Sequence, residues 1–201
     1  MSTPSLSKVV LLPGDIGLST NETFMAKGIR FFGWLSTRNA RKSHAWASIG
    51  YGMIIESLNR IKINKQEKYD TGYTEVSVYR LPLTEDERES FRQGVMLKAA
   101  EGYGWTKLPM FALDGILSGA SRIFGNKKPV FFFTKHAKIF NIPVCSQLVV
   151  YALHKFTNYR VLNEDGKPVE WRVVSPDYLE DLLLLPHNKA ESVYEYIKTE
   201  T

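Results

Sequence analysis

The sequence lacks several features that particular classes of protein require. It has one cysteine in 201 residues, which excludes an intramolecular disulfide framework and every zinc site built from several cysteines. No apolar run approaches the roughly 18 residues that a membrane-spanning helix needs. No His, Asp or Glu cluster has metal-ligand spacing, and neither a P-loop nor a G-x-G-x-x-G segment is present. We therefore expect no metal, no cofactor, no nucleotide and no transmembrane segment.

The composition is that of a globular protein. Hydrophobic residues make up 44% of the chain and charged residues 23%, which is enough for a core and unlike a disordered sequence. We expect a single domain over residues 1–201, with a core at about 9–184 and a helical tail at about 187–201. Residues 1–13 lack the features of a signal peptide, which predicts synthesis in the cytosol. Delivery in a phage particle or as a secreted effector would leave no such mark.

The formal charge of +5 is unevenly distributed. Residues 1–68 hold ten basic and four acidic side chains, whereas the other two thirds are close to neutral. This excess either forms a patch that meets an anionic surface or is a solvated helix face. No binding motif with interleaved aromatics and glycines accompanies it, so nucleic acid is not an expected partner. The patch would include Lys27, Arg30, Arg38, Arg41 and Lys42.

Strand and helix patterns alternate without the regular order of a parallel sheet. A T-x-x-E capping box opens a helix at Thr84, which Gly102 would end, and Ser175-Pro176 is a typical helix start. The pattern predicts an α+β fold on an antiparallel sheet. Expected strands lie at 9–12, 74–81, 130–133 and 159–162, with a hairpin at 44–58. Further helices are expected at about 21–35, capped by Ser19, Thr20 or Asn21, and at 144–155.

Cys145 is a candidate nucleophile because of its position. It follows Pro143 and precedes the apolar helical run, so we expect it at the N-terminus of a buried helix. Unpaired amides and the positive end of the helix dipole stabilise a thiolate there, and the same amides can donate to an oxyanion. A small buried hydrophobic residue is the alternative interpretation of a free cysteine.

His44 is the histidine best placed to act as a base. His154 lies on the opposite face of the Cys145 helix, His187 is expected to be exposed, and His136 could reach Cys145 only through a folded-back loop. His44 begins the first strand of the predicted hairpin, in which Trp46 would lie opposite Glu56. His44 and Glu56 would then be diagonal neighbours on one face.

Glu56 interrupts an apolar strand, and a partly buried carboxylate needs a hydrogen-bond partner. An imidazole N–H would satisfy this need and would fix the histidine tautomer for deprotonating a thiol. The alternative is an edge-strand glutamate that points to solvent.

Three segments resemble, in order and spacing, the permuted papain-like hydrolases of the NlpC/P60 superfamily, and the YiiX/YaeF-like amidases in particular. They are Leu-Pro-Gly-Asp-Ile at residues 12–16, the strand pair at 43–57 and Val-Cys-Ser-Gln-Leu-Val at 144–149. Weaker similarities are Gly-Tyr-Gly-Trp at 102–105 and Val-Ser-Pro-Asp-Tyr-Leu at 174–179. Gln147 stands where glutamate is commoner in the family.

The resemblance implies a permuted papain-like fold, with helices packed on a central antiparallel sheet and the nucleophile at a helix N-terminus. It also implies a Cys145–His44–Glu56 triad and an acyl-enzyme. By the same resemblance, Tyr103 and Ser146 are candidates for contacting the substrate or the oxyanion. The expected activity is that of a thiol-dependent amidase or cysteine peptidase.

The expected substrate is a peptide or another amide, with peptidoglycan stem peptides first. Two alternatives remain open. One is a lipid acyltransferase or thioesterase-like enzyme of the related lecithin:retinol acyltransferase-like branch, for which the Phe-rich segments at 31–34 and 131–133 could line an acyl site. The other is a non-catalytic binding or virion structural module that keeps the hydrolase-like fold.

Overall fold

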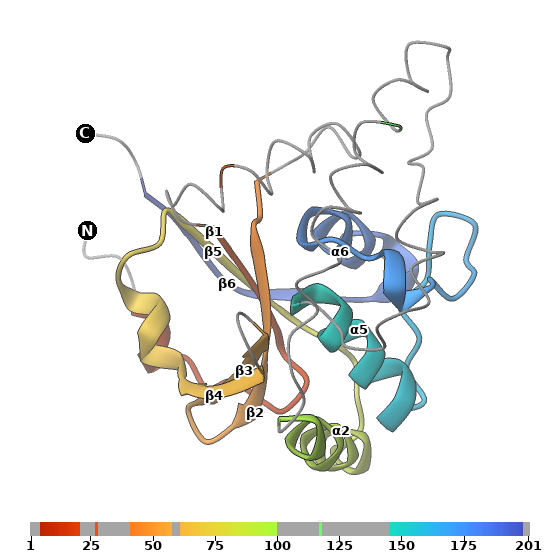
Figure 1. The fold of residues 1–201 in the computed structure, drawn as a ribbon, viewed down its shortest axis with the longest axis horizontal. Helices are drawn as coiled ribbons and strands as arrows, with labels where there is room; N and C mark the ends of the chain where they lie inside the picture. Colours follow the sequence, from red (N-terminus) through yellow and green to blue (C-terminus); the bar gives the residue numbers. More distant parts are fainter. Residues whose placement is uncertain are drawn as a thin grey trace.

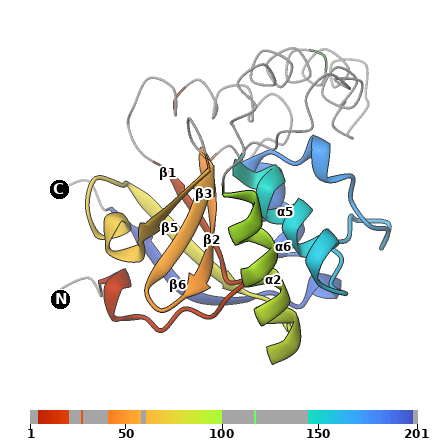
Figure 2. The same ribbon diagram turned by 60° about the horizontal axis from the view of Figure 1, so that its bottom comes forward.

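A computed structural model describes residues 5–20, 27, 41–57, 61–99, 117 and 145–198. In these ranges a six-stranded antiparallel sheet with the order β4-β3-β2-β1-β5-β6 carries helices on one side (Figures 1 and 2). The α+β class and the antiparallel sheet are therefore confirmed. The strands are β1 (Ile16–Thr20), β2 (His44–Gly50), β3 (Met53–Ser57), β4 (Ile61–Lys65), β5 (Glu75–Arg80) and β6 (Glu191–Ile197).

The helices are α2 (Glu85–Lys98), α5 (Cys145–Phe156) and α6 (Pro176–Leu183). Short 3-10 turns lie at Leu6–Lys8 (η1), Gln66–Asp70 (η2), Trp171–Val173 (η3) and Pro186–Asn188 (η4). The predicted capping box of α2 is present, with Thr84 and Glu87 each bonding the other's backbone. Ser175 caps α6 and Pro176 is its first residue, also as predicted.

Two apolar clusters cover the two faces of the sheet. Along β2, Ala45, Ala47 and Ile49 pack against the helices, whereas Trp46 faces the opposite cluster and stacks on Tyr69 of η2. This alternation is what a strand buried on both faces requires. Burial on both faces fixes the register, because a slip of one residue would exchange the two sets of side chains.

The predicted hairpin is present, with Trp46 opposite Glu56. Its turn residues Tyr51 and Gly52 both have positive φ, of 55° and 69°, which is the backbone of a type I′ turn. The register shifts by one residue between Ser48 and Gly50, so Gly50 pairs with Met53. This register shift is a β-bulge, and it lies on the turn side of Ser48, so the pairing of Trp46 with Glu56 keeps the predicted register.

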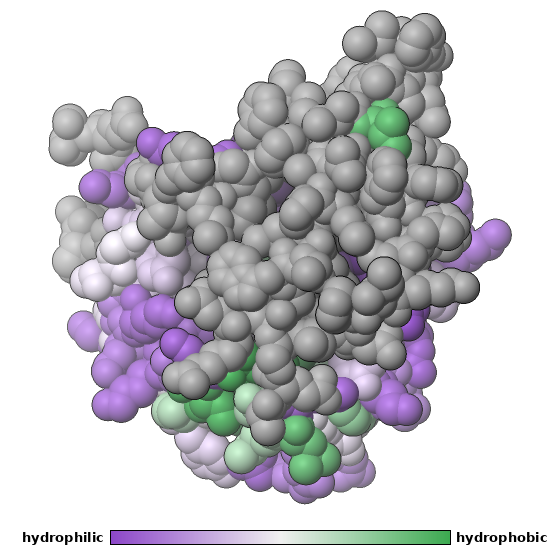
Figure 3. Space-filling view, in the orientation of Figure 1, coloured by the Kyte–Doolittle hydropathy of each residue, from purple (hydrophilic) through white to green (hydrophobic). Residues whose placement is uncertain are grey.

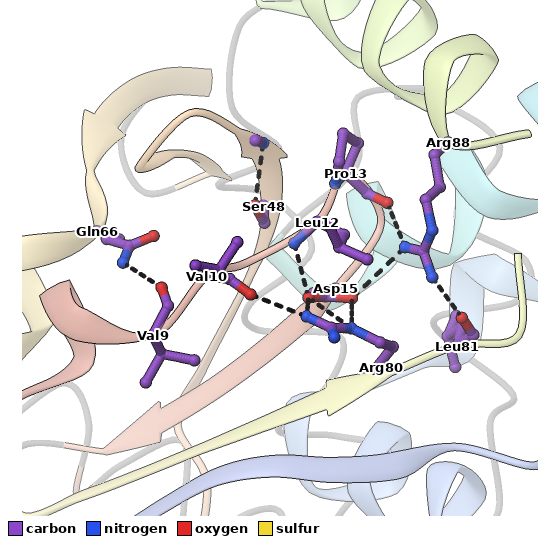
Figure 4. Close-up of polar contacts among 11 residues, drawn as sticks. Val9, Val10, Leu12, Pro13, Asp15, Ser48, Gln66, Arg80, Leu81 and Arg88 are labelled. Atoms are coloured by element: carbon purple, nitrogen blue, oxygen red, sulfur yellow. Dashed lines mark hydrogen bonds and ion pairs between the residues drawn. The ribbon is translucent and has the colours of Figure 1, made fainter. Parts of the chain in front are cut away.

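The expected strand at 9–12 is wrong, since the strand begins only at Ile16. Asp15, wholly buried, bonds the Leu12 amide at 2.8 Å and the Arg80 guanidinium at 2.7 Å (Figure 4). The Asp15 carbonyl accepts from the Ser48 amide at 2.8 Å. Arg88 of α2 lies 3.5 Å from the same carboxylate and also binds the carbonyl of Pro13. These contacts fix the chain in a turn just before β1.

Ser19 and Thr20 belong to β1. Ser19 pairs with β2 on one side and β5 on the other, Thr20 pairs with β5, and the Thr20 hydroxyl bonds that of Ser43 at 3.0 Å. The helix residues that either side chain would cap lie outside the described ranges. Of the helix expected at 21–35, only Lys27 is described, and its backbone is helical. The strand expected at 130–133 lies outside the described residues.

The helical tail expected at 187–201 is wrong for residues 191–197, which form β6. β-branched and aromatic residues favour a strand there, and β5 offers an edge, with Tyr194 opposite Val78 and Tyr196 opposite Val76. The strand expected at 159–162 reduces to one bridge between Leu162 and Pro168. α2 ends at Lys98, earlier than Gly102.

We expect Gly17→Ala to destabilise the fold strongly. A methyl group on Gly17 would lie 2.0 Å from the indole ring of Trp46, and overpacking of a core costs about 1–3 kcal/mol or more. Gly166→Ala is the control, because Gly166 has φ of +70° but open space around it, so its cost should be about 1 kcal/mol. Urea unfolding measures both, and a Gly17 variant no less stable than the control would contradict this packing.

Candidate active site

The sheet and one helix bring together the three residues that the sequence singles out. His44 is the first residue of β2, Glu56 lies on the adjacent strand β3, and Cys145 is the first residue of α5 as described. α5 is apolar on most of its surface and packs across β2 and β3. The burial of this helix therefore holds the cysteine beside the start of β2.

His44 and Glu56 are hydrogen-bonded, with Nε2 2.9 Å from Oε2. The predicted diagonal relation across the β2–β3 ladder is thus confirmed. Because Nε2 is occupied by the carboxylate, Nδ1 is the ring nitrogen left for Cys145, whose thiol is the other side-chain partner of the ring. The carboxylate thereby selects the ring orientation.

Glu56 is fully buried and does not point to solvent. Besides His44, its carboxylate accepts from the Tyr69 hydroxyl at 2.6 Å and from Asn64 and Lys68. Burial alone would raise the pKa of Glu56, but the bonds from His44, Lys68 and Tyr69 lower it to about 2. Glu56 is therefore ionised at all pH values near neutrality.

The Cys145 side chain is buried and 6% exposed. Burial raises the pKa of a thiol, but the hydrogen bond and charge of His44, with the amides of Ala45 and Ser146, bring the pKa of Cys145 below its ordinary value. Burial correspondingly lowers the pKa of His44, while its bonds to Cys145 and Glu56 raise it to about 9. Both directions favour a thiolate beside an imidazolium.

The other predicted contact residues have different outcomes. The Ser146 hydroxyl donates to the Val174 carbonyl at 2.7 Å and is fully buried, so its side chain is used in packing and only its amide lies at the sulfur. Gln147 likewise donates to the Arg172 carbonyl. Tyr103 lies outside the described residues.

His154 and His187 take no part in this site. The Nε2 of His154 accepts from the Val161 amide at 3.0 Å, and burial together with Arg160 lowers the pKa of His154 to about 4. His187 is exposed, as predicted. His136 lies outside the described residues.

Lys42 does not belong to a surface patch, which corrects the sequence interpretation. Its side chain is fully buried and its ammonium lies 2.5 Å from Glu75. Lys27 and Arg41 are exposed, and Arg30 and Arg38 lie outside the described residues. In the view of Figure 3, green apolar side chains show between purple ones in the lower part of the surface, and some of them lie where Figure 1 shows α2.

Sequence reasoning missed three of the residues that surround Glu56. Asn64 comes from β4, and Lys68 and Tyr69 come from the 3-10 turn that follows it. The pairing of β3 with β4, in which Ile54 lies opposite Asn64, is what returns this segment to the carboxylate. A prediction of a third strand after the hairpin would have indicated that this segment lies near Glu56, but it would not have identified these side chains.

No protein-family model and no curated protein sequence matches this chain. Within the described ranges, no three His, Cys, Asp or Glu side chains are grouped so that they could hold a metal ion. No helix among those ranges is long and apolar enough to span a membrane.

We expect Glu56 to control acid unfolding. Its pKa of about 2 lies below the ordinary value of 4.5. The contribution of Glu56 to the free energy of unfolding is therefore full above pH 4.5 and is lost as the pH falls towards 2. A shift of this size corresponds to about 3 kcal/mol. In Glu56→Gln this part of the pH dependence should be absent, as measured by urea unfolding between pH 2 and 6.

The matched control is Glu67→Gln. Glu67 is an exposed glutamate whose ion pair with Lys65 is also exposed, so this variant should keep the wild-type pH dependence. Equal pH dependence in all three proteins would contradict a buried, ionised Glu56.

Proposed function

We propose that this protein is a thiol-dependent hydrolase, in which Cys145 is the nucleophile, His44 the base and Glu56 the residue that orients His44. The observation that carries the proposal is that His44 is hydrogen-bonded to the buried Glu56 carboxylate at 2.9 Å and that the same ring lowers the pKa of the buried Cys145 thiol. An activated cysteine, a base and a group that fixes the base are the parts that covalent catalysis requires.

The proposed reaction is acyl transfer. The Cys145 thiolate attacks the carbonyl carbon of an amide or ester and forms a tetrahedral intermediate, and the nearby amides donate to its oxyanion. Imidazolium His44 then gives its proton to the leaving amine or alcohol as the C–N or C–O bond breaks, and the acyl group stays on the sulfur as a thioester. Water, deprotonated by His44, releases the acid and restores the thiol–imidazole pair.

The fold proposed for this chain is the permuted papain-like fold of the NlpC/P60 superfamily. The chain order His44, Glu56, Cys145 and the placement of the cysteine at the start of a helix that packs on the sheet support it. By the same resemblance, the substrate class proposed is a peptide amide, with the stem peptides of peptidoglycan first.

We expect the alkylation of Cys145 by iodoacetamide to reveal the pair directly. The rate should follow a thiol pKa well below the free value of about 8.5, because His44 stabilises the thiolate. In His44→Ala the apparent pKa should return towards that value. Since Cys145 is the only cysteine, every label reports this site.

His187→Ala serves as the control, because His187 is exposed and lies in η4. Its alkylation profile should equal that of the wild type. A thiol that titrates near 8.5 in the wild type, or that is indifferent to His44, would contradict the proposed pair.

Cys145→Ala should lower turnover by roughly a thousandfold or more while the protein stays folded, because the covalent route is lost. The assay measures new amino groups released from purified peptidoglycan, and in parallel the cleavage of a long-chain acyl amide in vesicles. Cleavage of the lipid amide alone would replace the peptide substrate by a lipid one. Hydrolysis that persists in Cys145→Ala would contradict the nucleophile.

A further inference from the structure

A second polar cluster lies directly before His44 in the chain, and the reaction proposed above does not use it. Asp177, at the start of α6, is 1% exposed, and its Oδ1 accepts the backbone N–H of Lys42 at 2.8 Å. Lys42 precedes His44 by two residues. A residue 135 positions away in sequence therefore holds the segment that leads into β2.

The Lys42 side chain is anchored in the same place. Its ammonium bonds Ser77 at 2.8 Å and Glu75 at 2.5 Å, both on β5, and lies 3.6 Å from Glu180 of α6. On the next residue, the Ser43 amide donates to the Ser19 carbonyl of β1 at 3.1 Å. The start of β2 is thus connected to β1, β5 and α6 by contacts just before His44.

Asp177 is not needed to cap its own helix. Ser175 is the N-cap of α6, and its hydroxyl accepts from the Tyr178 amide at 3.3 Å. Instead, Oδ1 of Asp177 accepts the Lys42 amide. Oδ2 is buried and has no hydrogen-bond partner among the described residues. A buried carboxyl that does not serve its own helix calls for another role.

The charges around Asp177 favour its neutral form. Burial, with Glu180 and Asp181 on α6, raises the pKa of Asp177 to about 8, against the lowering effect of Lys42. Glu75 on β5 shares the Lys42 ammonium, and Tyr79 donates to Glu180 at 3.0 Å. Asparagine, which has the shape of a protonated aspartic acid and keeps Oδ1, is therefore a close mimic of the native group at pH 7.

We propose that Asp177 is a positioning residue for His44, which holds the Lys42 backbone so that the first residue of β2 presents its ring to Cys145 and Glu56. The inference rests on the proposed function for its catalytic meaning. It assigns a role to the Ser-Pro-Asp start of α6, in which the serine caps the helix and the aspartate fixes the neighbouring strand.

The test compares the wild type with four variants by the pH profile of Cys145 alkylation with iodoacetamide. Asp177→Ala and Asp177→Leu both remove the acceptor, and leucine keeps the side-chain volume. Both should raise the apparent thiol pKa by roughly one unit, which is about a tenfold loss of thiolate below that pKa. Asp177→Asn keeps the acceptor and should react within about twofold of the wild type at pH 7.

Ser175→Ala is the matched control, because it removes the cap of α6 without touching Lys42. It should lower thermal stability and leave the thiol pKa unchanged, whereas a merely structural role for Asp177 would make the two positions behave alike. A thermal-unfolding curve for each variant shows that it is folded at the assay temperature. If the alanine variant does not fold, the leucine variant decides.

Stability gives a second readout. Because the pKa of Asp177 is raised, its contribution to the free energy of unfolding is full below pH 3.8, its ordinary pKa, and is lost as the pH rises towards 8. In Asp177→Asn this fall of the free energy of unfolding with pH should be absent. Wild-type thiol pKa values in both acceptor-free variants would overturn the inference and leave the proposed function standing. A wild-type thiol that itself titrates near 8.5 would instead overturn the proposed function.

Discussion

The buried carboxylate of Glu56 is the group on which the candidate site depends. A charge removed from water is costly unless hydrogen bonds replace its hydration, and four side chains provide them here. The donors come from β2, β4 and η2, so the charge is stabilised only when the sheet and its following turn are assembled. Glu56 thereby couples the formation of the fold to the orientation of the His44 ring.

The sequence contained enough local information to predict the centre of this arrangement. Gly50 and Gly52 marked the hairpin turn, strand alternation set Trp46 opposite Glu56, and Pro143 before an apolar helical run placed Cys145 at a helix start. Each of these signals arises from a few neighbouring residues whose conformations are restricted. Local rules are therefore sufficient for the hairpin, the capping box of α2 and the helix that contains Cys145.

Long-range pairing accounts for what the sequence did not predict. Ser19 and Thr20 have the side chains of helix caps, yet β2 and β5 take them into the sheet. The C-terminal residues 191–197 form a strand because β5 has a free edge, and no local pattern announces that edge. The burial of Lys42 has no local signal, because the three side chains that contact its ammonium lie on elements far away in the sequence.

The pKa shifts separate the groups that affect the reactivity of the thiol from those that affect the free energy of unfolding. Folding raises the pKa of His44 to about 9, so His44 binds its proton more tightly in the folded state. It lowers the pKa of Cys145 below the ordinary value of 9.0, so Cys145 releases its proton more readily. The two effects on proton uptake oppose each other, because the pair mainly moves one proton from sulfur to nitrogen. The shifts of His44 and Cys145 therefore act in opposite directions on the pH dependence of the free energy of unfolding. Glu56 changes the free energy of unfolding at acid pH, and Asp177 changes it as the pH rises towards 8. Stability profiles and alkylation profiles therefore report different members of one connected site.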